Sequence, residues 1–232
     1  MTRLGILGGT LDPIHCGHLA AASSARDAFE LTQVLVLPSG VPPHRPLQPQ
    51  ASAFHRFAMA SLAVSGMSRL QASDDELKAV GPSYTADTLD RQRARGFSAS
   101  QIFFITGADA FADIATWMRY PAVLDLANFV VVTRPGHLLE SLADRLPALA
   151  PRMRRASDAT NAGRQTLIYL LEAATPDVSS TVIRDRLRRG ERVTGLVPPL
   201  VETHIHQHGL YSPSANAPGD KADSADQLHG QN

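Results

Sequence analysis

Residues 8–19 read Gly-Gly-Thr-Leu-Asp-Pro-Ile-His-Cys-Gly-His-Leu, and this stretch decides the fold that we predict. The apolar run Leu4–Leu7 precedes it and is typical of a buried strand. The alanine-rich segment Ala20–Phe29 follows and predicts a helix. A strand, a glycine-rich turn and a helix N-terminus together form a place for phosphate, because glycine lets the backbone approach the ligand and free helix N–H groups point at the anion.

Two histidines, His15 and His18, lie within this turn, three residues apart. On a first helical turn such positions face the same way, so both rings reach one phosphate. Near neutral pH, imidazole donates hydrogen bonds or carries a positive charge. A Gly-Gly-Thr alone would be explained as a simple connection between a strand and a helix. The two histidines make a phosphate-binding turn the better interpretation.

The string Gly-Gly-Thr…Asp-Pro…His-Cys-Gly-His resembles the signature of the nicotinate/nicotinamide-nucleotide adenylyltransferases, usually Gly-Gly-Thr-Phe-Asp-Pro-x-His-x-Gly-His. Leu11 stands where phenylalanine is usual, which is an apolar-for-apolar change. The resemblance covers about residues 4–211. It implies an α/β fold, a doubly wound parallel sheet of the Rossmann-like nucleotidyltransferase type. It also implies phosphate binding by Gly8, Gly9 and Thr10, and catalysis by His15 and His18 at the α-phosphate of ATP, with His18 the larger contributor.

Composition narrows the possible partners and the compartment. Of the 232 residues, 44% are hydrophobic and 19% are charged, which is ordinary for a soluble globular protein. Lys plus Arg equals Asp plus Glu at 22 each, so electrostatics do not favour nucleic acid. Cys16 is the single cysteine, which excludes an intrachain disulfide, and no activating partner favours it as a nucleophile. There is neither a membrane-length apolar run nor a signal peptide, so we expect a cytoplasmic protein without a membrane partner.

A second strand, Gln33–Leu37, ends at a proline-rich loop, Ser39–Pro49. Strand, helix and strand within about thirty residues predict a right-handed parallel βαβ unit. The loop therefore follows a strand's carboxyl end, where open α/β sheets bind ligands, although an ordinary surface loop is the alternative. Its Pro-Pro-His-Arg run resembles the family's Pro-Pro-His-Lys. The resemblance implies that Arg45 contacts the triphosphate.

The segment 82–89 reads Pro-Ser-Tyr-Thr-Ala-Asp-Thr-Leu and begins a predicted helix that runs to Arg95. Ser83 or Thr85 is a suitable N-cap, and capping alone would explain both residues. The string also resembles the family's Ser-Tyr-Thr-x-Asp-Thr-Leu. There the Thr85 backbone would bind the nicotinate end of the mononucleotide, and a helix N-terminus does favour a carboxylate.

Another apolar strand, Gln101–Thr106, is followed by a glycine and an acid, Gly107 and Asp109. Glycine lets the backbone pass near a nucleotide, and the acid can accept hydrogen bonds from ribose hydroxyls. With Trp117 eight residues on, the string resembles the family's Phe-x-x-Gly-x-Asp…Trp pattern, in which the tryptophan packs on the pyridine ring; ordinary packing is the alternative. The Arg-Pro-Gly after the next strand also matches the family and implies mononucleotide binding by Arg134.

The run Ser179–Arg184 starts another predicted helix. Ser and Thr hydroxyls at a helix start cap its N–H groups or bind an anion, and an arginine one turn along can hold the same anion. An ordinary N-cap with a surface arginine is the alternative. The string resembles the family's Ile-Ser-Ser-Thr-x-Ile-Arg motif, which implies that Ser180, Thr181 and Arg184 hold the ATP phosphates.

Two other segments are given structural interpretations. The helical segment Ala53–Val64 places Phe54 and Phe57 on an apolar face, so we expect both in the core. The acidic run Asp74–Glu76 is expected in a solvated loop, because acids adjacent in sequence do not converge on a metal ion.

The last predicted helix, Pro198–His208, contains His204, His206 and His208. His204 and His208 share a helix face and His206 does not. With no third ligand apparent in the sequence, we do not predict a metal site there.

We expect residues 1–211 to form one nucleotidyltransferase domain. Residues 212–232 contain only one large apolar side chain, Leu228, and are predicted to be a disordered tail.

The resemblance implies the reaction of ATP with nicotinate mononucleotide to give nicotinate adenine dinucleotide and pyrophosphate, in NAD biosynthesis, with Mg²⁺ accompanying ATP. Related adenylyltransferases that use nicotinamide mononucleotide or phosphopantetheine, and cytidylyltransferases, share the His-x-Gly-His turn and stay open as alternatives. Thr85 and Trp117 favour a pyridine pocket. A non-catalytic nucleotide sensor is the remaining alternative, against which His15, His18 and Arg184 argue. The oligomeric state is not predicted.

Overall fold

The computed structural model describes residues 2–43, 49–133, 139–158 and 165–212. Its described strands form one seven-stranded sheet in the order β3-β2-β1-β4-β5-β7-β6, and every adjacent pair is parallel. The predicted doubly wound parallel sheet is therefore confirmed. The strands are β1 (Leu4–Gly9), β2 (Gln33–Pro38), β3 (Leu70–Ala72), β4 (Ile102–Gly107), β5 (Asn128–Thr133), β6 (Met153–Arg155) and β7 (Ile168–Glu172).

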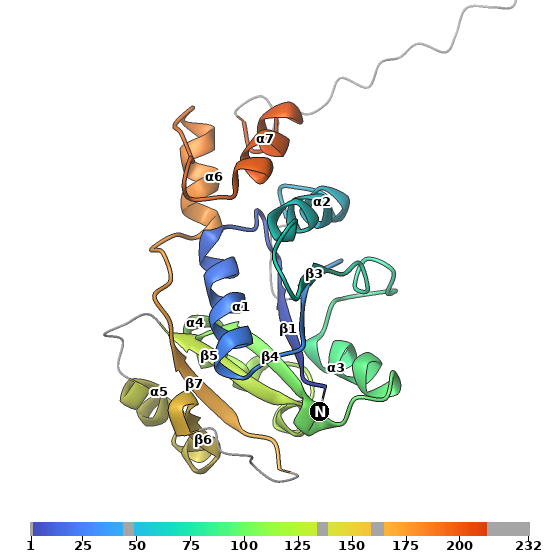
Figure 1. Ribbon diagram of the computed structural model, residues 1–232, viewed down its shortest axis with the longest axis vertical. Helices are drawn as coiled ribbons and strands as arrows, with labels where there is room; N and C mark the ends of the chain where they lie inside the picture. Colours follow the sequence, from blue (N-terminus) through green and yellow to red (C-terminus); the bar gives the residue numbers. More distant parts are fainter. Residues whose placement is uncertain (1, 44–48, 134–138, 159–164, 213–232) are drawn as a thin grey trace, which may run out of the picture.

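The strand order reverses direction at β1, which pairs with β2 on one side and with β4 on the other. The carboxyl ends of parallel strands at such a switch point leave a crevice in which ligands bind. In Figure 1 the chain begins at the lower end of β1, and the strand runs upward toward α2, α6 and α7. These helices therefore stand at the ligand-binding end of the sheet.

Both faces of the sheet are covered by helices. One core cluster joins α1, α2, α6 and α7 to one face, and a second joins α3, α4 and α5 to the other. Burial on both faces explains why the strands read as continuous apolar runs rather than as alternating ones. The helices are α1 (Cys16–Ala28), α2 (Ala53–Val64), α3 (Thr85–Ala94), α4 (Ala108–Ala112), α5 (Leu139–Arg145), α6 (Ser180–Arg188) and α7 (Pro199–Gln207).

Helix α1 begins at Cys16, four residues before the start expected from the alanine-rich run. The reason is that His15 occupies the N-cap position, so the second half of the glycine-rich stretch is already helical. Gly8 and Gly9 belong to β1, so the turn between β1 and α1 is Thr10–His15.

The prediction that Phe54 lies in the core is wrong, and the prediction of a solvated acidic loop is right only in part. Phe54 is 80% exposed, because the buried face of α2 runs through Arg56, Met59, Ala60 and Ala63, and Phe57 is only half-buried. The acidic run is not fully solvated either, since Glu76 is buried.

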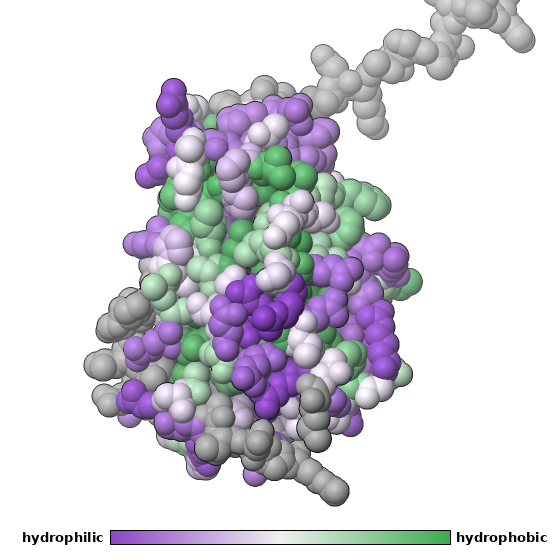
Figure 2. All heavy atoms as spheres, in the orientation of Figure 1, coloured by the Kyte–Doolittle hydropathy of each residue, from purple (hydrophilic) through white to green (hydrophobic). Residues whose placement is uncertain are grey.

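Hydrophilic and hydrophobic side chains are mixed over the face shown in Figure 2. Among the described residues, no helix is both long and apolar enough to span a membrane. The predicted tail lies outside the described residues beyond Ser212.

Candidate active site

A cavity of about 460 Å³ opens at the carboxyl ends of β1, β2 and β4. Gly8, Gly9 and Thr10 form its β1 wall, and Phe104 and Thr106 of β4 lie beside them. Further lining residues are Ser39, Pro42, Pro43, Glu76, Ser83, Tyr84, Thr85, Ala110, Asp113, Thr116, Trp117 and Met118. The structure thus brings Thr85 and Trp117, 32 positions apart in sequence, into one cavity with Gly8, Gly9 and Thr10, the first three residues of the predicted phosphate-binding stretch.

The start of α3 forms one wall of this cavity. Tyr84 is its N-cap, and no side chain caps the helix, so the prediction that Ser83 or Thr85 does so is wrong. The Ser83 hydroxyl oxygen instead accepts hydrogen bonds from the N–H groups of Gly40 (2.9 Å) and Val41 (3.3 Å). Ser83 therefore ties the α3 N-terminus to the loop after β2. The first turn of α3 keeps its positive dipole end toward the cavity at Thr85.

Trp117 is half-buried in the cavity wall and is held by two aromatic rings. Its ring centroid lies 6.0 Å from that of Phe104 at an interplanar angle of 84°, and 6.3 Å from that of Phe129. Edge-to-face packing of this kind is favourable and orients the indole. These two contacts therefore fix the orientation of the indole in the cavity wall.

Glu76 brings a buried carboxylate to the cavity lining. The Thr88 hydroxyl donates a hydrogen bond to it, and an Arg91 nitrogen lies 3.8 Å from it. The loops after β2 and β3 approach closely here. A Cβ atom on Gly40 would lie 2.4 Å from the Glu76 carbonyl oxygen, so only glycine fits at this position.

Asp12 anchors the turn after β1 from inside the protein. Its carboxylate is buried and accepts hydrogen bonds from the N–H groups of Gln50 (2.9 Å) and Ala51 (3.1 Å) and from the Tyr211 hydroxyl (2.7 Å). Three chain segments far apart in sequence are thereby joined at one carboxylate. Burial, together with the adjacent Asp12 charge, raises the pKa of Tyr211, so its hydroxyl stays protonated and remains a donor.

Arg56 holds the same turn from the α2 side. Its guanidinium is 1% exposed and donates to the carbonyls of Ala51 (3.2 Å), Thr10 (2.8 Å), Ser39 (2.6 Å) and Gly40 (3.2 Å). Thr10 and Ser39 directly follow β1 and β2, so one side chain fixes the ends of both strands. Burial lowers the pKa of Arg56 and Asp12 opposes the change, but an arginine stays charged at neutral pH.

Helix α6 is docked on the turn by the residues that were predicted to bind phosphate. The Arg184 Nη1 donates to the Asp12 carbonyl (2.7 Å), and its Nη2 donates to the Thr181 hydroxyl (3.2 Å). The Ser180 hydroxyl donates to the Pro13 carbonyl (2.9 Å). Arg184 is only 8% exposed, so it is not a surface arginine, as the structural alternative would have it. The N-terminus of α6 therefore lies against the histidine-bearing turn.

His15 and His18 lie together, as their spacing predicts. Their ring centroids are 3.7 Å apart at 30°, and the His15 backbone N–H donates to the His18 Nδ1 (3.2 Å). Because Nδ1 accepts, the proton of a neutral His18 sits on Nε2. Burial, and to a smaller degree the charge of His15, lowers the pKa of His18 well below its ordinary value. The direction of this shift favours the neutral form of His18, which donates a hydrogen bond from Nε2.

Several predicted site residues do not line the cavity. Gly107 and Asp109 are exposed at the end of β4 and the start of α4. Among the described residues, the others outside the lining are His15, His18, Ser180, Thr181 and Arg184. Arg45 and Arg134 lie outside the described residues. Burial raises the pKa of the Cys16 thiol, so it is not an activated nucleophile.

Sequence reasoning missed four residues that build the site: Asp12 as an anchor, Arg56, Glu76 and Tyr211. One usable signal existed for Arg56, which stands at helical spacing with the apolar Met59, Ala60 and Ala63 and so on the buried face. No local pattern pointed to the Asp12–Tyr211 contact, because the two residues are 199 positions apart.

Comparison with known proteins agrees with this architecture. Residues 6–186 match the cytidylyltransferase-like family. Two relatives, from Citrifermentans bemidjiense (strain Bem) and Geobacter sp. (strain M21), are each named "probable nicotinate-nucleotide adenylyltransferase". They are 39% and 41% identical over 216 and 212 residues, covering 90% of this chain and 98% of each relative. The chain therefore belongs to the nicotinate-nucleotide adenylyltransferase family and is a nucleotidyltransferase enzyme.

A solved structure supports the fold independently. The nicotinic acid mononucleotide adenylyltransferase of Plasmodium falciparum, complexed with NaAD, superposes with a TM-score of 0.68. The alignment covers 91% of this chain and 98% of that chain at 18% identity, so this similarity supports the fold and nothing further.

Proposed function

We propose that this enzyme transfers AMP from ATP, supplied as its Mg²⁺ complex, to nicotinate mononucleotide, and releases nicotinate adenine dinucleotide and pyrophosphate. The observation that carries the proposal is one cavity that the α3 N-terminus and Trp117 share with Gly8, Gly9 and Thr10, the residues that lead into the turn before His15. The cavity volume lies in the range of about 300–1,000 Å³ usual for small-molecule sites. The names of the relatives point to the same acceptor.

The mononucleotide end is assigned to Thr85 and Trp117. The helix dipole at Thr85 favours a carboxylate on the pyridine ring, and the indole stacks on the ring itself. Arg134, which follows β5, is proposed to contact the mononucleotide phosphate.

The triphosphate is assigned to the other side of the turn. Gly8, Gly9 and Thr10 expose backbone to it, and the N-terminus of α6 at Ser180, Thr181 and Arg184 adds a positive end beside it. Arg45 is proposed to join these contacts, and Gly107 with Asp109 to meet the ribose. Mg²⁺ enters with the phosphates, which is its usual mode of binding.

The chemistry asks for positioning rather than for a strong base. The mononucleotide phosphate is already an anion at pH 7, and it attacks the α-phosphorus in line while pyrophosphate leaves. Catalysis then consists of bringing two polyanions together and stabilising the charge that develops on the transferring group. His18 suits this role, since its Nε2–H is a donor that brings no desolvated charge of its own. Removing it is expected to raise the barrier by about 3 kcal/mol, or on the order of 10²-fold in kcat.

A pyrophosphate-release assay with MgATP tests the proposal. Nicotinate mononucleotide, nicotinamide mononucleotide and phosphopantetheine are offered in parallel, and His18→Ala serves as the matched inactive variant. We expect release with nicotinate mononucleotide and a large loss in the variant. Release with phosphopantetheine alone would overturn the acceptor, and ATP binding without any release would favour a nucleotide sensor.

A further inference from the structure

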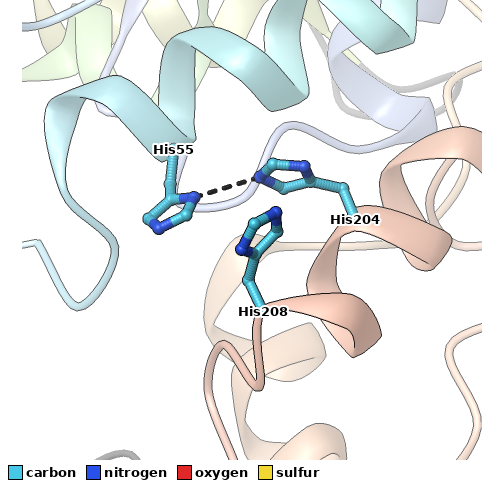
Figure 3. A group of neighbouring side chains, drawn as sticks. All are labelled: His55, His204 and His208. Carbon is cyan, nitrogen blue, oxygen red and sulfur yellow. Dashed lines mark hydrogen bonds between the residues drawn. The ribbon is translucent and has the colours of Figure 1, made fainter.

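Three histidines from two helices meet on the surface beside the turn. His55 comes from the first turn of α2, whereas His204 lies in α7 and His208 directly after it (Figure 3). Each offers one ring nitrogen to a common space, and these three atoms all lie within 4.8 Å of one another. His55 and His204 are half-buried and His208 is exposed. The third ligand that the sequence did not reveal is therefore His55, 149 positions before His204.

The packing of the two helices creates this cluster. Apolar residues of α2 and α7 share one core, with Met59 of α2 and Ile205 of α7 both fully buried. His204 and His208 are one turn apart and so face the same way, toward α2. The cluster is thus held by a built interface, rather than by a chance meeting of flexible loops.

We propose that His55, His204 and His208 form a zinc-binding site that joins α2 to α7. Zinc takes imidazole nitrogens at about 2.0–2.1 Å in tetrahedral geometry, which places two ligand nitrogens about 3.3 Å apart. The His55 Nδ1 and the His204 Nε2 are hydrogen-bonded to each other at 3.1 Å, a separation close to the one that zinc needs (Figure 3). His208 is the exposed member, so a change of its side-chain rotamer can complete the set. Three nitrogen ligands leave the fourth position for a water molecule.

The three rings lie close enough together to bind one ion. The ring centroids of His55 and His204 lie 4.8 Å and 4.4 Å from that of His208. Imidazole nitrogen is the commonest metal ligand in proteins. Among the described residues, the ion pair between a histidine and a carboxylate joins His206 to Glu202 at 4.0 Å, and His206 is not part of the cluster.

The location gives the metal a structural task. His55 is adjacent to Arg56, which holds the ends of β1 and β2, and α7 leads directly to Tyr211, which holds Asp12. A zinc ion at the cluster would fasten the C-terminal helix to α2 and so stabilise the turn from outside the catalytic cavity. This inference does not depend on which acceptor the enzyme uses.

Metal titration of the full-length, untagged, chelator-treated enzyme tests the site. Zn²⁺ is shared between the protein and a chromophoric chelator, which reports stoichiometry and affinity. We expect one tightly bound equivalent, weakened at least about 30-fold in His55→Ala, His204→Ala and His208→Ala separately. His206→Ala is the matched control, because it removes an exposed histidine of the same helix that points away from the cluster, and it is expected to bind as the wild type does.

Two further readouts separate zinc binding from a folding defect. Zn²⁺ at about 100 times its dissociation constant is expected to raise the unfolding temperature of the wild type and of His206→Ala, but not that of the cluster variants. In chelator all variants should unfold near the wild-type temperature; if His55→Ala or His204→Ala does not fold, the exposed His208→Ala decides the question. Co²⁺ in place of zinc should show the intense visible bands of tetrahedral coordination. No binding in the micromolar range, or binding that His204→Ala and His208→Ala leave unchanged, overturns the proposal.

Discussion

Replacing Tyr211 by phenylalanine tests the anchoring of the turn with the removal of one atom. The Tyr211 hydroxyl donates to the Asp12 Oδ1 at 2.7 Å, and both residues are at least 95% buried. Water cannot readily replace the missing donor at that depth. The ring itself still fills the same space in the variant, so no cavity term is added.

The expected magnitude follows from the type of bond. A hydrogen bond to a charged acceptor contributes about 1.5–3 kcal/mol to stability. Asp12 keeps two backbone donors, from Gln50 and Ala51, and an Arg184 nitrogen 3.9 Å away, so the loss should lie near the middle of that range. We expect Tyr211→Phe to lower the free energy of unfolding by about 2 kcal/mol. For a protein of this size that is a fall of about 4–8 °C in unfolding temperature.

Urea denaturation followed by circular dichroism measures the change, with Tyr169→Phe as the matched control. Tyr169 is equally buried, at 5% exposed, but its hydroxyl makes no hydrogen bond within the part of the chain that the structure describes. The control should therefore change the free energy of unfolding by less than about 0.5 kcal/mol. Equal effects of the two substitutions would refute the reasoning, because the Asp12 contact would then contribute nothing of its own.

Three other predictions follow from the same geometry. The pKa of His18 is lowered in the folded state, so only the unfolded chain binds the extra proton as the pH falls through about 6.5. The free energy of unfolding should therefore decrease below that pH. His18→Gln should flatten this part of the stability–pH curve, which urea denaturation at several pH values measures. Gly17→Ala would place a Cβ 3.0 Å from the His15 Nδ1 and displace that ring. The value of kcat/KM should fall about tenfold, while the free energy of unfolding should change by less than about 1 kcal/mol. An unchanged kcat/KM would contradict the view that the position of the His15 ring matters for catalysis. Gly40→Ala would force apart the loops after β2 and β3 at the Glu76 carbonyl, and urea denaturation should show a free energy of unfolding lower by about 1–3 kcal/mol. Gly66→Ala is the control: a Cβ there meets nothing within 4 Å, so only the positive φ of Gly66 disfavours alanine.

Local sequence was enough for the central strands and most of the longer helices, and the motifs it contains were enough for the fold class. The apolar runs that form β1, β2, β4 and β5 are buried on both faces of the sheet. A strand that is buried on both faces needs apolar residues at consecutive positions, and such a run can be recognised from the sequence alone. The glycine-rich turn with His15 and His18 needed only neighbours in sequence, so their proximity was predictable. Where two local signals competed, as at the start of α1, the helix began earlier than composition alone indicated.

Tertiary structure decided what holds the site together. Asp12 and Tyr211, Arg56 and Thr10, and His55 and His204 meet only after the sheet and its helices have packed. A buried polar group takes its partner from whichever segment packs against it, and no period or spacing along the chain records that segment. The chemistry-bearing residues of the turn were therefore determined by the sequence itself. The clamps that fix the turn, and the third histidine beside it, came only from packing of distant segments.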